Sequence, residues 1–77
     1  MNLSTGDIKM TVQAFVYTSD EQVTAVVENT NHIVVADNLE QVVDKIIDYL
    51  YVLSGNSYKV VDETYQNNHS TLYFKAA

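Results

Sequence analysis

A single segment of this chain carries apolar residues at helical spacing, and the other patterned segments have the shorter period of strands. In residues 39–53 the apolar positions recur every three to four residues and form one broad face. Residues 8–18 instead alternate between apolar and other side chains, as a half-buried strand does. One helix among several strands restricts the chain to an α+β fold, because each layer must bury its apolar face against the other.

The order of these segments predicts the architecture. Short turns separate the strands before and after the helix, so the sheet should be mostly antiparallel, with the helix on one face in a two-layer β-β-β-α-β-β domain. One helix cannot cover five strands, and part of the sheet should therefore stay bare. We expect strands at 8–18, 22–29, 32–36, 58–65 and 71–75, a helix at 39–53, and a hairpin loop at 66–70.

Local signals mark both ends of the predicted helix. Asp37 or Asn38 is the expected N-cap, and with Asn38 in that position Gln41 follows three residues later, as in a capping box. Gly55 suits a left-handed C-cap, since glycine adopts positive φ without strain. These signals fix the helix boundaries more closely than periodicity alone would.

Composition restricts the setting in which the chain works. The 77 residues, 47% of them hydrophobic, fit one domain at 1–77, with residues 1–6 as a candidate disordered segment. The absence of cysteine excludes disulfides and thiolate metal sites and favours a reducing compartment. No run approaches the roughly 18 apolar residues of a membrane helix, and the first residues lack the layout of a signal peptide. We therefore expect a cytoplasmic protein without a membrane partner.

The charge balance favours one class of partner. Ten acidic side chains oppose four lysines and no arginine, which gives a formal charge of −6. Direct binding to nucleic acid is disfavoured, because phosphate contacts need Lys and Arg. The same charge suits a basic protein, such as one that itself handles nucleic acid. The alternative is that the charge only keeps the chain soluble.

Three acidic residues line the polar side of the predicted helix. Glu40, Asp44 and Asp48 follow each other at intervals of four, and Tyr51 lies in the same sector. Like charges at this spacing destabilise a helix by about 0.2–0.5 kcal/mol per pair, and no lysine stands four residues from any of them. Glu40, Asp44, Asp48 and Tyr51 are therefore candidate partner-binding residues. An ordinary solvated helix face is the alternative.

Aromatic residues supply a second set of candidates. Six tyrosines are a high share for this length, and tyrosine is enriched at interface hot spots because it pairs a large apolar area with a polar tip. Phe15 and Tyr17 fall on the less apolar face of the first strand, and we add them to the partner-binding candidates. Tyr73 should point outward from the last strand, and strict alternation puts Tyr65 on one face with Lys59. Cross-strand pairs that only stabilise the sheet are the alternative.

The sequence offers no catalytic or metal-binding constellation. Adjacent acidic residues on a strand point to opposite faces, so the acidic pairs do not form dyads. His32 and His69 are the only histidines, whereas a zinc site needs three or four ligands. We expect no catalytic residues, no metal and no cofactor, and hence no enzyme. A small enzyme or ligand carrier would instead require a pocket with convergent polar groups.

The chain shares four traits with a known class of small proteins: its length, its acidity, its lack of cysteine, and a strand meander that leads into one helix. The strands of this meander are expected at 10–17, 23–29 and 33–37. The chain resembles the small proteins with which phages and mobile elements block bacterial defences, anti-CRISPR proteins especially. The resemblance implies a non-enzymatic inhibitor in the bacterial cytoplasm that mimics nucleic acid. Its partner would be a basic nucleic-acid-binding host protein, such as a CRISPR effector. The alternative is a structural or antitoxin-like homodimer that pairs through the bare sheet or an edge strand.

Overall fold

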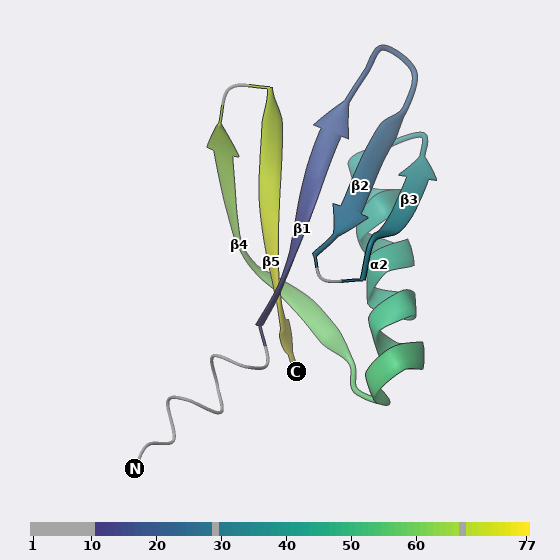
Figure 1. The fold of residues 1–77 in the computed structure, drawn as a ribbon, viewed down its shortest axis with the longest axis vertical. Coiled ribbons are helices and arrows are strands. Elements are labelled where there is room, and N and C mark those ends of the chain that lie inside the picture. Colours follow the sequence, from purple (N-terminus) through teal and green to yellow (C-terminus); the bar gives the residue numbers. More distant parts are fainter. Residues whose placement is uncertain (1–10, 29, 67) are drawn as a thin grey trace.

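The computed structural model describes residues 11–28, 30–66 and 68–77 and shows one helix packed on a sheet (Figure 1). The described elements follow the predicted β-β-β-α-β-β order, and the α+β fold is confirmed. The segments at 1–6 and 8–10, for which we predicted disorder and the start of a strand, lie outside the described residues. The elements are β1 (Thr11–Thr18), β2 (Val23–Val27), β3 (His32–Ala36), α2 (Leu39–Ser54), β4 (Tyr58–Gln66) and β5 (His69–Ala76).

The five strands form one sheet in the order β3-β2-β1-β5-β4, and every neighbouring pair is antiparallel. The pair β1 and β5 lies at the centre, although these strands are the first and last elements described. Their ladder runs from Thr11 opposite Lys75 to Tyr17 opposite His69. The strands β3 and β4 are the two edges of the sheet (Figure 1).

Helix α2 begins and ends where its capping residues predict. The backbone of Asn38 is extended, and its Oδ1 accepts a hydrogen bond from the N–H of Gln41 at 2.9 Å. The Gln41 Oε1 accepts in turn from the N–H of Asp37 at 3.3 Å. At the other end Gly55 has a φ of 78° and donates its N–H to the carbonyl of Tyr51 at 2.7 Å. Both helix ends are thus held by local hydrogen bonds.

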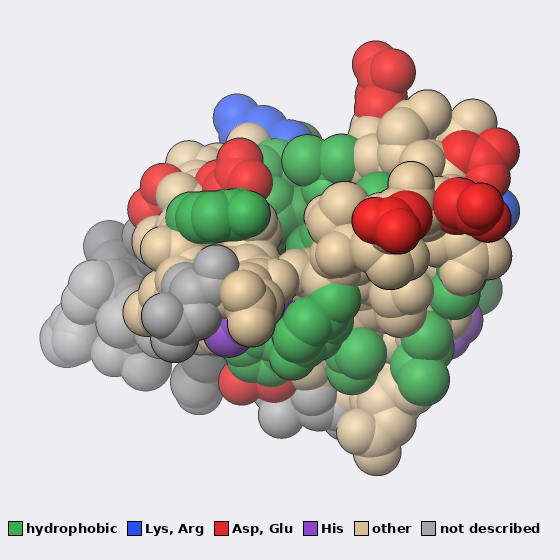
Figure 2. All heavy atoms as spheres, turned by 90° about the horizontal axis from the view of Figure 1, so that it is seen from above, with side chains coloured by type: hydrophobic (Ala, Val, Ile, Leu, Met, Phe, Trp, Pro, Cys, Tyr) green, Lys and Arg blue, Asp and Glu red, His purple; other side chains and the backbone are tan. Residues whose placement is uncertain are grey.

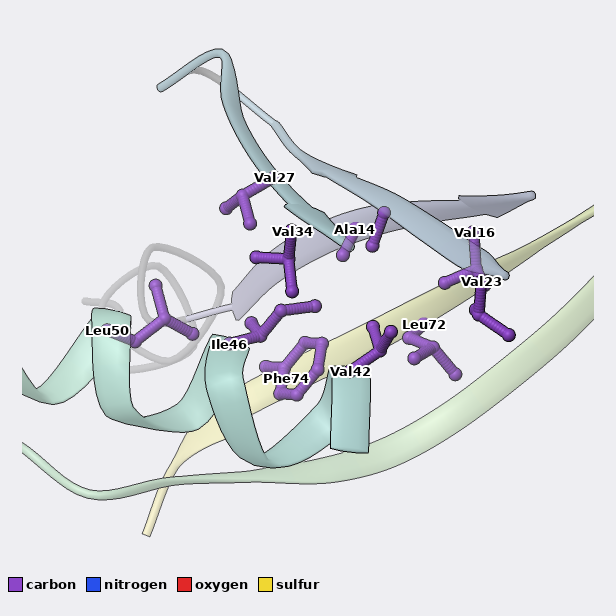
Figure 3. Close-up of a cluster of buried hydrophobic side chains, with 11 residues drawn as sticks. Ala14, Val16, Val23, Val27, Val34, Val42, Ile46, Leu50, Leu72 and Phe74 are labelled. Carbon is purple, nitrogen blue, oxygen red and sulfur yellow. The ribbon is translucent and has the colours of Figure 1, made fainter. Parts of the chain in front are cut away.

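The core lies between α2 and the sheet face that the helix covers (Figure 3). Val42, Ile46 and Leu50 point from the helix into this layer, and Phe74 of β5 is fully buried against it. A helix is about 10–12 Å across and strands lie about 4.8 Å apart, so one helix covers about two strands. The buried hydrophobic strand residues are Ala14, Val16, Val23, Ala25, Val27, Val34, Leu72 and Phe74, and the buried polar ones are Ser70 and Thr71.

The strand boundaries differ from the prediction by one or two residues at both ends of β2, at both ends of β5 and at the end of β4. The strand β2 covers Val23–Val27 and not the predicted 22–29, because the chain turns at Glu28. The strand β5 begins at His69, two residues before the predicted start at Thr71. Gln66 pairs with His69, and this pair extends the β4–β5 ladder into the predicted hairpin loop. The prediction of a loop at 66–70 was therefore wrong.

A β-bulge in β4 changes which residues share a face. The ladder with β5 shifts between Val60 and Asp62, so that Val61 is an extra residue. An extra residue moves the alternation by one position. Lys59 consequently lies on the uncovered face of the sheet, whereas Tyr65 lies on the face that carries the helix. The prediction that these two residues share a face was wrong for this reason.

Candidate partner-binding surfaces

The first candidate surface is the acidic helix face, formed by Glu40, Asp44, Asp48 and Tyr51. All four side chains are exposed, and Tyr51 is exposed to 56%. Successive acids are four residues apart, which is about 6 Å along the helix axis, so the row is about 12 Å long. The helix itself is anchored by its buried opposite side, and the row is therefore held on a fixed element.

Phe15 and Tyr17 lie on the other side of the sheet. Their neighbours in β1, Ala14 and Val16, are buried on the helix-covered face. Phe15 is half-buried and Tyr17 is 47% exposed, both on the face without a helix. The sheet thus separates these aromatics from the acidic helix face. The predicted partner-binding residues form two surfaces rather than one, and a flat partner cannot contact both at once.

The second surface is the open sheet face, whose side chains are aligned in rows by the strand registers. It is apolar over β3 and at Val26, Phe15 and Tyr17, carries Gln13 and Thr24 beside them, and is mostly polar over β5 and β4. One row contains Ile33, Val26, Phe15, Thr71 and Thr64, and the next contains Val35, Thr24, Tyr17, His69 and Gln66.

Aromatic contacts organise the middle of the open sheet face. The His69 ring stacks on Tyr17 with centroids 5.3 Å apart and meets Phe15 edge-on at 6.4 Å. Tyr73, in the next row of β5, is half-buried on the same face, while Leu72 and Phe74 on either side of it are buried beneath the helix. The predicted outward position of Tyr73 is confirmed.

Sequence reasoning missed the exposed aliphatic side chains of the open sheet face. Ile33 is 61% exposed and Val35 is 45% exposed, both on edge strand β3. Their alternation with buried Val34 was visible in the sequence and places both on one face. His69 was missed because we predicted that it lies in a loop. An edge strand with large exposed aliphatic side chains is a site where another chain can pair.

Charge is distributed unevenly between the two surfaces. The helix carries a row of three acids, whereas Asp62 is the acid that β4 places on the open sheet face, near Lys59 and Lys75. The view from above in Figure 2 shows hydrophobic side chains along the lower side and most of the visible acidic ones above them. One surface is thus suited to a basic partner and the other to an apolar one.

The described residues were compared with the arrangement that a metal ion needs, and one hollow lies at a turn. Within 11–28, 30–66 and 68–77 there is no group of three or more histidine and acidic side chains placed to hold a metal ion. A hollow at the β1–β2 turn is lined by exposed residues only, among them Asp20 and Glu21. No helix in the described part of the chain is long and apolar enough to cross a membrane.

Comparisons with known proteins gave no match, whether with family models, with curated proteins or with solved structures. The two surfaces are therefore interpreted from their own geometry and chemistry.

Proposed function

We propose that this chain is a non-enzymatic binding module that inhibits a basic, nucleic-acid-handling bacterial protein by docking its acidic helix face onto that protein. The observation that carries the proposal is the row of three exposed acids beside an exposed tyrosine on a capped helix. The acids would supply long-range steering and fix the orientation of docking. Tyr51 would supply an apolar anchor with a polar tip.

The charge density of the helix indicates how such a module would act. The acids stand about 6 Å apart along the helix axis, whereas one strand of duplex DNA carries a charge about every 3.4 Å. The row is therefore about half as dense as one nucleic-acid strand and only about 12 Å long. This length suits a local wedge in a basic channel, as in the anti-CRISPR proteins that the chain resembles, better than the replacement of a long duplex.

The cost of the acidic row to the helix also supports a binding role. Each like-charge pair four residues apart destabilises a helix by about 0.2–0.5 kcal/mol, and the row contains two such pairs. The side chains of Asn38 and Gln41 accept hydrogen bonds from backbone N–H groups at the start of the helix, so the acidic row is not needed there as an acceptor. Glu40 alone lies in the first turn, where the helix dipole favours an acid. Asp44 and Asp48 lack this stabilisation, which is consistent with retention for contact with a partner.

A capture experiment with matched charge variants tests the proposal. The chain is used as bait in bacterial lysate, and bound proteins are eluted with increasing salt. We expect a basic nucleic-acid-binding protein that is released by salt, because exposed charges are screened at high ionic strength. The triple variant Glu40→Gln, Asp44→Asn, Asp48→Asn should lose this protein.

The control removes the same number of charges elsewhere. Asp20→Asn, Glu21→Gln and Glu63→Gln neutralise three exposed acids outside the helix and leave the same net charge as the helix variant. This control should retain the captured protein. Equal loss in both variants would show that total charge and not the helix matters. If neither variant changed capture, the acidic helix face would be excluded as the docking surface.

A further inference from the structure

The two edges of the sheet differ in how they are protected against pairing with another strand. Edge strand β4 is interrupted by the bulge at Val61 and carries Lys59, Asp62 and Glu63. The Asp62 Oδ1 also accepts a hydrogen bond from the N–H of Glu63 at 2.8 Å, which occupies a backbone donor locally. Bulges and charged side chains are the usual means by which edge strands avoid association.

Edge strand β3 has none of these features. Its five residues, His32–Ala36, include no acid, lysine, arginine or proline, and its ladder with β2 runs without a register shift. Ile33 and Val35 project large, exposed aliphatic side chains beside this edge. A regular, uncharged edge with exposed aliphatic residues is a template for a further strand.

We propose that β3 pairs antiparallel with β3 of a second copy of this chain, giving a continuous sheet with five strands from each copy. The pleat restricts the register, because opposed residues must point to the same face. Centring the pair on Val34 satisfies this condition and pairs all five residues of both strands. Ile33 then lies opposite Val35 of the second copy, and Val35 opposite Ile33, so four aliphatic side chains form one patch.

Charge opposes a second copy less at this edge than at the acidic helix face, despite the net charge of −6. Approach through the acidic helix face would oppose three acids with three acids, whereas β3 contains no acid. The nearest acid in sequence is Asp37, directly after the strand. In the proposed register, the Asp37 residues of the two copies are six residues apart along the ladder, about 20 Å. This separation exceeds the Debye length of about 8–10 Å, so their repulsion is screened.

The helix supplies a second apolar contact on the same side of the molecule. The ring of Tyr49 stacks on that of His32 in β3, with centroids 3.7 Å apart, so this flank of α2 faces the β3 edge. Val52 lies three residues further along the same flank and is 81% exposed. Two exposed charged residues border this flank: Lys45, four residues before Tyr49, and Asp48, four residues before Val52. Helix α2 contacts edge strand β3 as well as β2 and β4. In the proposed dimer the two helices lie on the same face of the continuous sheet, with these flanks towards each other.

Sedimentation equilibrium of the full chain over a range of concentrations tests the proposal. The wild type should reach twice the 8.7 kDa of one chain. Val35→Lys should weaken association by about tenfold or more, because it places a charge against Ile33 at two symmetric positions. Val61→Lys is the control, because it makes the same change on the other edge strand. Val61 is 47% exposed and Val35 is 45% exposed. The control should leave the measured mass at that of the wild type.

A charge-pair variant tests the register itself. In Ile33→Glu, Val35→Lys each glutamate faces a lysine of the second copy, so this double variant should recover association that Val35→Lys alone has lost. Recovery also shows that the substituted chains fold. A wild type that stays monomeric at high micromolar concentration would overturn the proposal. Equal effects of Val35→Lys and Val61→Lys would do the same, as would a double variant weaker than Val35→Lys.

Discussion

Val26 and Val27 are neighbours in β2 with identical side chains and different surroundings. Val27 is fully buried beneath α2, whereas Val26 is half-buried on the open sheet face. The same contrast separates Val34, 5% exposed, from Val35, 45% exposed, in β3. Alternation decides which residues share a face, but the position of the single helix decides which face becomes the core.

The open sheet face has the composition of a face that is covered. Strands with valine on both faces are typical of sheets that are covered on both sides. Here one helix covers one side, and Phe15, Val26 and Ile33 form an uncovered apolar row on the other. A partner that covers this row would gain hydrophobic burial of about 25 cal/mol per Å² of apolar surface.

The largest predicted difference between the two faces comes from valine-to-alanine changes in β2. Val27→Ala should lower the free energy of unfolding by about 2–3 kcal/mol, because it removes buried methyl groups and leaves a cavity. Val26→Ala should lower it by less than about 1 kcal/mol, since only lateral contacts with neighbouring strands are lost. Urea denaturation of both variants at low protein concentration measures the two values. Equal losses would mean that the open sheet face is covered in solution.

A smaller change in the free energy of unfolding is expected at the start of α2, the helix that covers only one face of the sheet. Asn38→Ala removes the acceptor for the N–H of Gln41 and should lower the free energy of unfolding by about 1 kcal/mol. Asn56→Ala, just beyond the helix, is the matched control and should change stability little, because the structure shows a hydrogen bond only from the backbone N–H of Asn56. Thermal denaturation followed by circular dichroism compares them. Identical melting of the two variants would show that the cap contributes nothing.

The smallest effect concerns the outer surface of the covering helix. Asp44→Asn relieves repulsion with both Glu40 and Asp48 and should raise the free energy of unfolding by about 0.5 kcal/mol at low salt. The gain should fade at high salt, because these side chains are exposed. Asp20→Asn removes the same charge in the β1–β2 turn and serves as the control. Stabilisation of equal size in both variants would assign the effect to net charge.

The sequence was sufficient to predict the elements that depend on local interactions. The strand at 32–36 and the start of the helix at Leu39 were predicted to the residue, and Asn38 and Gly55 cap the helix as expected. Capping is a contact between residues a few positions apart, so it can be read from a short segment. The acidic row was predicted for the same reason, since spacing on one helix fixes its alignment.

Features that depend on distant residues could not be predicted in this way. Strand order decides that β3 and β4 are edges, and it is set by pairing between segments far apart in sequence. The bulge at Val61 depends on the β5 register, and it moved Tyr65 away from Lys59. Likewise, the separation of Phe15 and Tyr17 from the acidic helix face follows from the face on which α2 packs.

The interior position of β5 has a consequence for how the domain forms during synthesis. Because β5 follows the other described elements, β1 lacks one neighbour and β4 lacks its described neighbour until β5 has left the ribosome. Leu72 and Phe74, which fill the middle of the core, also arrive at that stage. Contacts between segments so far apart in sequence form slowly. The nascent chain should therefore complete its five-stranded sheet only after translation of β5.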